Sequence, residues 1–178
     1  MSASIARNIL IIGLMGTGKS SLARILSRKT GALLVDTDLR IEKELGMPIS
    51  AVFAQHGEAF FRDSETKLLT LQTKMNGCII STGGGMVIKE ENRKILREMG
   101  LVVWLRASVE TIFARVSRNK NRPLLHNSDP VGTLRKLAEI REPWYREIAH
   151  LEIDTGSTTR SASVETILRA AGWECKAT

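Results

Sequence analysis

Short apolar runs alternate with longer amphipathic segments along the chain. The short runs are rich in aliphatic and β-branched residues, as buried strands are, and the longer segments place apolar side chains at helical spacing. The expected strands cover residues 8–12, 32–35, 78–81, 101–105 and 151–154. The expected helices cover residues 21–30, 39–45, 49–53, 58–75, 89–99, 109–116, 130–149 and 163–171. This alternation predicts an α/β fold around a parallel sheet.

A glycine-rich segment joins the first expected strand to the first expected helix. Residues 13–20 fit the phosphate-loop pattern G-x-x-x-x-G-K-[ST], in the strand–loop–helix context that the pattern requires. Backbone N–H groups, the helix N-terminus and Lys19 can bind phosphates there, and Ser20 is placed to coordinate Mg²⁺. The alternative, a glycine-rich turn without a ligand, is disfavoured by this context. The predicted nucleotide-binding residues in this segment are Gly16, Thr17, Gly18, Lys19, Ser20 and Ser21.

Composition narrows the class of protein. The 178 residues suit one domain with a sizeable core, so we expect a single domain over residues 1–178. The net charge is +7, but the 26 basic residues are scattered, without a polybasic block or an aromatic stacking platform. This distribution argues against nucleic acid or a membrane as partner and favours small anionic ligands. Two cysteines without metal-ligand spacing, and an N-terminus without an apolar signal core, favour a cytoplasmic protein.

Two carboxylates follow the second expected strand. Asp36 and Asp38 are one residue apart, so on an extended strand they point to opposite sides. In an open parallel sheet this end of the strand faces the ligand crevice, so one carboxylate can face Mg²⁺ and phosphate while the other faces a neighbouring substrate. Either aspartate could instead cap the next helix, which would explain one carboxylate but not both.

A long insertion separates the second and third expected strands. Residues 39–75 exceed a simple crossover and predict a small lobe over the site. Within it, Arg62 and Glu65 share a helical face, either as a surface salt bridge or as an arginine held for an anionic substrate. After the third strand come Gly83, Gly84 and Gly85. Three glycines are costly in chain entropy and predict a close approach of the backbone to a ligand, with a plain loop as the alternative.

Residues of about 117–129 form a basic, polar segment that predicts a lid. A lid would fold over the nucleotide, expel water and bring Arg122 to the transferring group, whereas a solvated loop is the alternative. Pro143 lies inside the next expected helix and should kink or interrupt it near Arg141, which aims that guanidinium at the crevice. The three histidines share no spacing and are expected to be structural or exposed.

In their order and spacing these motifs resemble the shikimate kinase family, over about residues 9–168. The resemblance rests on residues 13–20, 36–38, 61–62, 83–85, 122–125 and 141–145. The resemblance implies a three-layer P-loop kinase fold, with a five-stranded parallel sheet in the order 2-3-1-4-5, a substrate-binding lobe at about 39–75 and a lid at about 117–129. It implies Mg²⁺-dependent transfer of the γ-phosphoryl group of ATP to the 3-hydroxyl of shikimate, on the route to chorismate and the aromatic amino acids.

The resemblance also implies a role for each matching residue. Asp36 would hold Mg²⁺ with Ser20, and Asp38 would bind the shikimate hydroxyls. The implied carboxylate and pocket residues are Arg62, Arg141 and the backbone of Gly83, Gly84 and Gly85. The implied nucleotide contacts beyond the phosphate loop are Arg115 against adenine, Arg122 at the phosphates and Arg160 stacked on the base. Residues 156–160 depart from the arginine-rich pattern of the family. The implied catalytic residues are Lys19, Asp38 and Arg122.

Three other functions compete with this interpretation. They are another small phosphate-loop kinase, for gluconate or a nucleoside monophosphate; a noncatalytic module that senses ATP; and a basic nucleic-acid binder, which a steep salt dependence would reveal. Arg62, Arg141 and the glycines favour a small carboxylate-bearing polyol as the acceptor. An aspartate of ordinary pKa cannot strip a free alcohol, so we expect Asp38 to orient the hydroxyl and accept its proton late. We expect a monomer.

Overall fold

The computed structural model describes residues 7–117 and 129–176. At its centre is a parallel sheet of five strands in the order β2-β3-β1-β4-β5, which confirms the order that the resemblance implies. The strands are β1 (Ile9–Ile12), β2 (Leu33–Asp36), β3 (Cys78–Ser81), β4 (Leu101–Arg106) and β5 (Leu151–Asp154).

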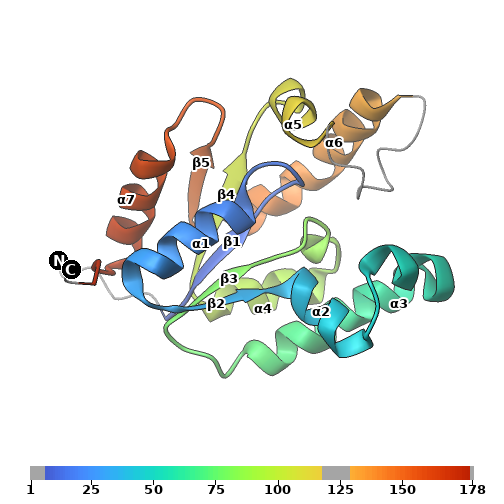
Figure 1. Ribbon diagram of the computed structural model, residues 1–178, viewed down its shortest axis with the longest axis horizontal. Coiled ribbons are helices and arrows are strands. Elements are labelled where there is room, and N and C mark those ends of the chain that lie inside the picture. Colours follow the sequence, from blue (N-terminus) through green and yellow to red (C-terminus); the bar gives the residue numbers. More distant parts are fainter. Residues whose placement is uncertain (1–6, 118–128, 177–178) are drawn as a thin grey trace.

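Helices cover both faces of the sheet and make three layers (Figure 1). On one face lie α1 (Lys19–Thr30) and α7 (Arg160–Ala171). On the other lie the second half of α3 (Ile49–Gln72), α4 (Glu90–Met99) and α6 (Pro130–Ile148). The remaining elements are α2 (Thr37–Leu45), the short 3₁₀ turn η1 (Met86–Ile88) and α5 (Val109–Val116). No described helix is both long and apolar enough to cross a bilayer.

The central strand shows why the apolar runs form a sheet covered on both faces. All four residues of β1 are fully buried. Leu10 and Ile12 pack toward α4 and α6, whereas Ile9 and Ile11 pack toward α1 and α7. A strand buried on both sides has no solvent face, so its sequence is continuously apolar rather than alternating. Its carboxyl end leads directly into the phosphate loop and α1, next to the ends of β3 and β4.

Most expected elements are confirmed, but α2 and α7 begin earlier than expected. The helix after β2 begins at Thr37, so Asp38 lies in its first turn and the expectation that Asp36 and Asp38 alternate along a strand is wrong. Similarly, α7 begins at Arg160 rather than Ser163, because Thr159 caps it by accepting a hydrogen bond from the Ala162 N–H. In both places a side-chain cap sets the boundary, ahead of the first apolar position.

Two breaks inside helices were expected, and the structure treats them differently. The expected helices 49–53 and 58–75 form one element, α3, which bends at Gly57 (φ 79°, ψ 173°). At Pro143 a kink or an interruption was expected; the interruption is absent, since α6 continues from Pro130 to Ile148. Pro143 lacks an N–H to donate to the preceding turn, but its fixed φ is compatible with a helix.

Candidate active site

The phosphate loop connects β1 to α1. Gly18 forms the N-cap of α1 with a left-handed backbone (φ 98°, ψ 13°), a conformation that favours glycine. Within the loop the Thr17 hydroxyl donates to the Leu14 carbonyl (2.8 Å), and Lys19 Nζ donates to the same oxygen (2.9 Å). The lysine is therefore folded back over the loop, where a bound phosphate would offer it a stronger, charged partner.

Asp36 joins the phosphate loop to α2. Its Oδ2 accepts a hydrogen bond from Ser20 Oγ (2.9 Å), and its Oδ1 caps α2 by accepting from the Leu39 N–H (3.4 Å). Asp36 thus caps the helix, as one interpretation of the sequence had it, and also contacts Ser20 of the phosphate loop. Ser81 Oγ, at the end of β3, lies 3.5 Å from Ser20 Oγ. These are hard oxygen donors of the kind that Mg²⁺ prefers, and they are too few for an all-protein cage.

Among the described residues, no group of three or more His, Cys, Asp or Glu side chains could hold a metal ion by itself. Mg²⁺ in nucleotide sites normally keeps waters and phosphate oxygens and takes only one or two protein ligands. Ser20 and Asp36 fit such an ion when it arrives with a nucleotide.

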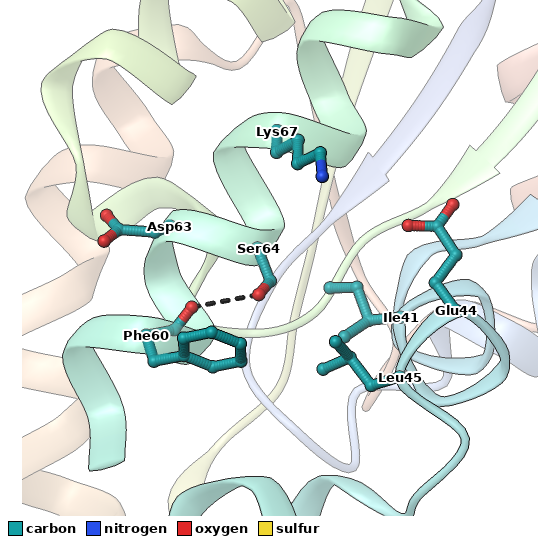
Figure 2. A pocket seen from close by; sticks show the side chains of 7 residues that line it. All are labelled: Ile41, Glu44, Leu45, Phe60, Asp63, Ser64 and Lys67. Carbon is teal, nitrogen blue, oxygen red and sulfur yellow. Dashed lines mark hydrogen bonds between the residues drawn. The ribbon is translucent and has the colours of Figure 1, made fainter. Parts of the chain in front are cut away.

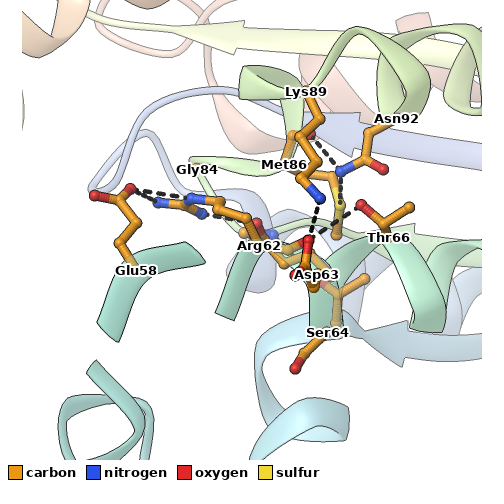
Figure 3. Close-up of polar contacts among 12 residues, drawn as sticks. Glu58, Arg62, Asp63, Ser64, Thr66, Gly84, Met86, Lys89 and Asn92 are labelled. Carbon is orange, nitrogen blue, oxygen red and sulfur yellow. Dashed lines mark hydrogen bonds and ion pairs between the residues drawn. The ribbon is translucent and has the colours of Figure 1, made fainter. Parts of the chain in front are cut away.

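Arg62 is held on α3 between two carboxylates. Its Nη1 donates to Glu65 Oε2 (2.7 Å), while Nε and Nη2 donate to Glu58 Oε1 (3.1 and 2.8 Å; Figure 3). The Arg62 side chain is 11% exposed and that of Glu65 is 0% exposed. This burial contradicts a surface salt bridge. The guanidinium is pre-oriented by three hydrogen bonds, as a site for a planar anion requires.

The three glycines after β3 lie beside Arg62, and together with Asp38, Glu65 and Arg141 they form the cluster that we call the pocket. The Gly83 N–H donates to Thr37 Oγ1 (2.9 Å), and the Gly84 carbonyl accepts from Arg141 Nη1 (3.2 Å) and the Tyr145 hydroxyl (2.5 Å). Arg141 and Tyr145 are 7% and 1% exposed. This strand-to-helix segment is therefore fastened to α2 and α6, and Arg141 is brought to the same place as Arg62.

The glycines are required by close approach of the protein's own side chains. A Cβ on Gly85 would lie 2.2–2.6 Å from Nη1, Cζ and Nη2 of Arg62, so the guanidinium lies directly against this residue. A Cβ on Gly83 would lie 2.4 Å from Asp38 Oδ1 and 3.0 Å from Glu65 Oε1. The glycines thus let Asp38, Arg62 and Glu65 gather at the end of β3. The sequence had predicted close approach, but to a ligand.

Glu65 has an unusual electrostatic environment in this cluster. Burial raises the pKa of its carboxyl to about 7, although Arg62 works against the rise, and the nearby Asp38 charge adds to it. Burial also raises the pKa of the Tyr145 hydroxyl, which therefore stays a neutral donor to Gly84. The cluster thus combines two guanidinium charges with a buried carboxyl whose pKa is raised to about 7.

Arg115 and Arg160 lie on the other side of the phosphate loop. They line one cavity of about 120 Å³, together with Thr17, Gly18, Ser21, Thr155 and Thr158. Arg115 is fixed there because Nη1 donates to Thr155 Oγ1 (2.9 Å) and Nη2 to the Thr155 carbonyl (2.7 Å). The cavity adjoins the N-terminus of α1 and suits the nucleoside part of a ligand whose phosphates occupy the loop.

A larger cavity, of about 270 Å³, lies elsewhere (Figure 2). It is a groove between α2 and α3, lined by Ile41, Leu45, Phe60 and Lys67 among others. At 100° per residue, Phe60 and Lys67 lie on the side of α3 opposite Arg62. The groove is therefore separate from the site just described.

The structure thus brings together most of the predicted site residues, in two adjoining groups. Around the phosphate loop lie Gly16, Thr17, Gly18, Lys19, Ser20, Ser21, Asp36, Arg115 and Arg160; around the end of β3 lie Asp38, Arg62, Gly83, Gly84, Gly85 and Arg141. A Cβ on Gly84 would lie 3.4 Å from the Gly13 carbonyl oxygen and the Met15 nitrogen, so the two groups meet there. The predicted lid residue Arg122 lies outside the described residues, as does most of the segment 117–129.

Sequence reasoning missed four residues that support the site. Glu58 is the second partner of Arg62, Thr37 holds Gly83, Tyr145 holds Gly84 and Thr155 anchors Arg115. Only Glu58 left a local signal, since it stands one helical turn before Arg62. The other three act across 40 or more residues of sequence.

A phosphate loop at a topological switch of a parallel sheet, beside two buried guanidinium groups, is typical of a small-molecule phosphate-loop kinase. A family model described as shikimate kinase matches residues 15–171. The chain belongs to the shikimate kinase family.

Individual relatives agree with this assignment. A shikimate kinase of Bordetella avium (strain 197N) is 44% identical over 160 residues, which cover 90% of this chain and 77% of that protein. A shikimate kinase of Ralstonia nicotianae (strain ATCC BAA-1114 / GMI1000) is 40% identical over 161 residues, covering 90% and 85%.

Solved structures agree as well. The shikimate kinase from Acinetobacter baumannii in complex with shikimate has a TM-score of 0.87 at 38% identity and covers 92% of this chain and 91% of its own. A gluconokinase from Sinorhizobium meliloti 1021 has a TM-score of 0.62 at 16% identity, over 93% and 91%, and so shares only the fold. The family resemblance and the fold expected from the sequence are both confirmed.

Proposed function

We propose that this chain transfers the γ-phosphoryl group of ATP to the 3-hydroxyl of shikimate, forming shikimate 3-phosphate and ADP. The observation that carries the proposal is that the two arginines and the phosphate loop meet at the glycine segment 83–85. Arg62 and Arg141 lie against this segment, and the phosphate loop packs against Gly84. A small acceptor with a carboxylate can thereby be held within reach of a terminal phosphate. Such a product belongs on a route to chorismate and the aromatic amino acids.

Acceptor binding is the task of the pocket at the end of β3. Arg62 and Arg141 would bind the carboxylate of the acceptor, because buried, pre-oriented guanidinium groups favour a planar anion. Asp38, across Gly83, would accept hydrogen bonds from the hydroxyls and hold the attacking oxygen toward the phosphate loop. The backbone of Gly83, Gly84 and Gly85 closes this side of the pocket.

The phosphates would occupy the loop at the N-terminus of α1. Gly16, Thr17, Gly18 and Ser21 contribute the loop and first turn, and Lys19 would exchange its bond to the Leu14 carbonyl for the β- and γ-phosphates. Ser20 and Asp36 would hold Mg²⁺, which neutralises charge on the transferring phosphoryl group when it is bound. Arg122, in the proposed lid of about residues 117–129, would supply further positive charge. Arg115 and Arg160 would contact the adenine end of ATP.

Phosphoryl transfer asks mainly for positioning and for positive charge around the equatorial oxygens. In a loose transition state the attacking hydroxyl is barely bonded to phosphorus, so its proton leaves late. Asp38 then serves as an orienting group that accepts this proton at its carboxylate oxygen, without first generating an alkoxide.

We also infer the setting in which this activity works. The lobe of about residues 39–75, carried by α2 and α3, and the lid would belong to one domain spanning residues 1–178. Both cysteines are free thiols, and ATP is an intracellular metabolite, so we propose a cytoplasmic monomer whose partners are ATP and shikimate and include neither nucleic acid nor a membrane.

The test is ADP release from the purified protein with ATP and Mg²⁺, with shikimate, gluconate, a nucleoside monophosphate or no acceptor. Turnover with shikimate alone supports the proposal. Turnover with gluconate or a nucleoside monophosphate instead would overturn the role given to Arg62 and Arg141. ADP release that no acceptor stimulates would overturn the transfer reaction itself.

A further inference from the structure

Glu65 is buried in the acceptor pocket with only one of its oxygens engaged. Its side chain is 0% exposed, and Oε2 accepts a hydrogen bond from Arg62 Nη1 (2.7 Å). Its Oε1 is buried and has no hydrogen-bond partner among the residues that the structure describes. An ionised carboxylate oxygen in this position would forgo its solvation without compensation, whereas a protonated one carries no such charge.

The charges that face Glu65 come from three helices. Arg62 lies on α3 beside it, Asp38 lies on α2, and Arg141 with the neutral Tyr145 lies on α6. Asp38 Oδ1 and Glu65 Oε1 lie 2.4 and 3.0 Å from the point where a Cβ on Gly83 would stand, so two carboxylate oxygens flank one glycine. A second negative charge on Glu65 is therefore opposed by Asp38 as well as by burial.

Because Glu58 also pairs with Arg62, Arg62 does not need a negative charge on Glu65. It accepts two hydrogen bonds from Arg62 (Nε and Nη2; Figure 3), and its side chain is 59% exposed, so it carries its charge at little solvation cost. With Glu58 in place, Arg62 keeps an ion-pair partner whether Glu65 is ionised or not. The guanidinium is oriented in both states, and only the net charge of the pocket changes.

We propose that Glu65 takes up a proton when the carboxylate-bearing acceptor binds, and so acts as a positioning residue that sets the pocket charge to match an anion. This inference rests on the proposed function, since shikimate supplies the carboxylate. Binding places a third carboxylate beside Arg62 and Arg141, near Asp38 and Glu65. Protonation of Glu65 removes one of these negative charges, and Arg62 then forms ion pairs with the acceptor carboxylate and with Glu58.

A definite pH dependence follows. In the free protein the Glu65 carboxyl has a pKa of about 7, and the added anion raises the pKa further. Well below neutral pH, Glu65 is protonated before and after binding, so affinity is constant. As pH rises through about 7, each binding event takes up close to one proton, and affinity falls by up to about tenfold per pH unit. The shikimate carboxyl is ionised throughout this range, because unperturbed carboxyls titrate near pH 4.

The experiment is isothermal titration of the purified protein with shikimate between about pH 6 and 8.5, in two buffers of different ionisation enthalpy. The difference between buffers gives the number of protons taken up. For the unsubstituted protein we expect close to half a proton near pH 7, rising toward one above it, with tighter binding at low pH. Glu65→Gln should bind shikimate with no proton uptake and a flat pH profile. Glu147→Gln, a matched control at a glutamate that pairs with the buried Arg93 outside this cluster, should retain the uptake.

The outcomes separate this inference from the proposed function. Shikimate binding without proton uptake in the unsubstituted protein overturns the role of Glu65 and leaves the kinase assignment intact. This measurement needs no variant, so it can be made even if the Glu65→Gln protein fails to fold. Uptake that persists in Glu65→Gln also overturns the inference. A protein that neither binds nor phosphorylates shikimate overturns both.

Discussion

At the scale of single residues, Asp38 and Asp36 contact different parts of the site. Asp38 shares the end of β3 with Arg62 and Glu65, whereas Asp36 is bonded to Ser20 of the phosphate loop. We therefore expect Asp38→Asn to lower kcat by at least about a hundredfold, since it removes the proton acceptor, while ATP affinity stays near normal. Steady-state ADP release and ATP titration measure the two effects.

The neighbouring aspartate provides the control for Asp38. Asp36→Asn should weaken binding of Mg²⁺ and ATP together, because it alters the carboxylate that pairs with Ser20 Oγ. If Asp38→Asn weakened nucleotide binding as much as Asp36→Asn does, Asp38 would belong to the metal site and its role as orienting group would be lost.

The hydrogen-bond geometry of Arg62 gives a second prediction. Arg62→Lys replaces a planar fork, which makes three hydrogen bonds and lies flat against Gly85, with a point charge. We expect the KM for shikimate to rise by about ten- to a hundredfold, as the loss of one or two charged hydrogen bonds implies. The KM for ATP should not change.

Arg93 is a matched control for this substitution. Its side chain is also 11% exposed and pairs with Glu147, and its Nη1 donates to the Val87 carbonyl outside the pocket. Arg93→Lys should lower stability without changing the KM for shikimate. An unchanged shikimate KM in Arg62→Lys would remove Arg62 from the carboxylate site.

At the scale of elements, α6 fixes the glycine segment through Tyr145. The Tyr145 hydroxyl and Arg141 Nη1 donate to the same Gly84 carbonyl. Tyr145→Phe should lower the free energy of unfolding by about 1 kcal/mol and raise the KM for shikimate several-fold, because only Arg141 then donates to the Gly84 carbonyl. Urea unfolding and acceptor kinetics test this. Lost stability with an unchanged KM would show that Arg141 is sufficient to position the segment.

The strands could be predicted from the sequence more closely than the starts of the helices. The five strands could be predicted closely because both faces of the sheet are covered and each strand is a short apolar run. The starts of α2 and α7 could not, because Asp36 and Thr159 set them through caps that precede any apolar periodicity. The start of α2 lies two residues earlier than expected, so Asp38 lies in a helix and not at the end of a strand.

The site was predictable as a set of motifs and less so as a geometry. The phosphate loop and Arg62 with Glu65 are local patterns, so their chemistry can be read from spacing. The bonds from Thr37 to Gly83 and from Tyr145 to Gly84 join residues 46 and 61 positions apart. No periodicity encodes such pairs, and the reason for Gly83 and Gly85, which is room for Arg62, Asp38 and Glu65, emerges only when the chain is folded.

At the scale of the whole molecule, the sheet brings the ends of β1, β2 and β3 together. The charged residues Asp38, Arg62 and Glu65 gather at this place. Such a cluster makes global stability depend on pH through Glu65. Burial raises the pKa of this carboxyl from its ordinary 4.5 to about 7, so between these values the folded protein holds a proton that the unfolded chain releases. The contribution of Glu65 to stability is therefore full below about pH 4.5 and is lost as pH rises through 7.

Glu65→Gln, which cannot titrate, isolates this contribution. Relative to the variant, we expect the free energy of unfolding of the unsubstituted protein to fall by about 2.5 kcal/mol between about pH 5 and 8, since each pKa unit corresponds to about 1.4 kcal/mol. Urea unfolding of both proteins across this range measures the difference, and comparing the two cancels the titration of all other groups. Glu147→Gln should follow the unsubstituted protein, because Glu147 pairs with Arg93 and is not bonded to Arg62 or Glu65. A constant difference between Glu65→Gln and the unsubstituted protein would mean that Glu65 is ionised at neutral pH and that Arg62 outweighs the cost of its burial.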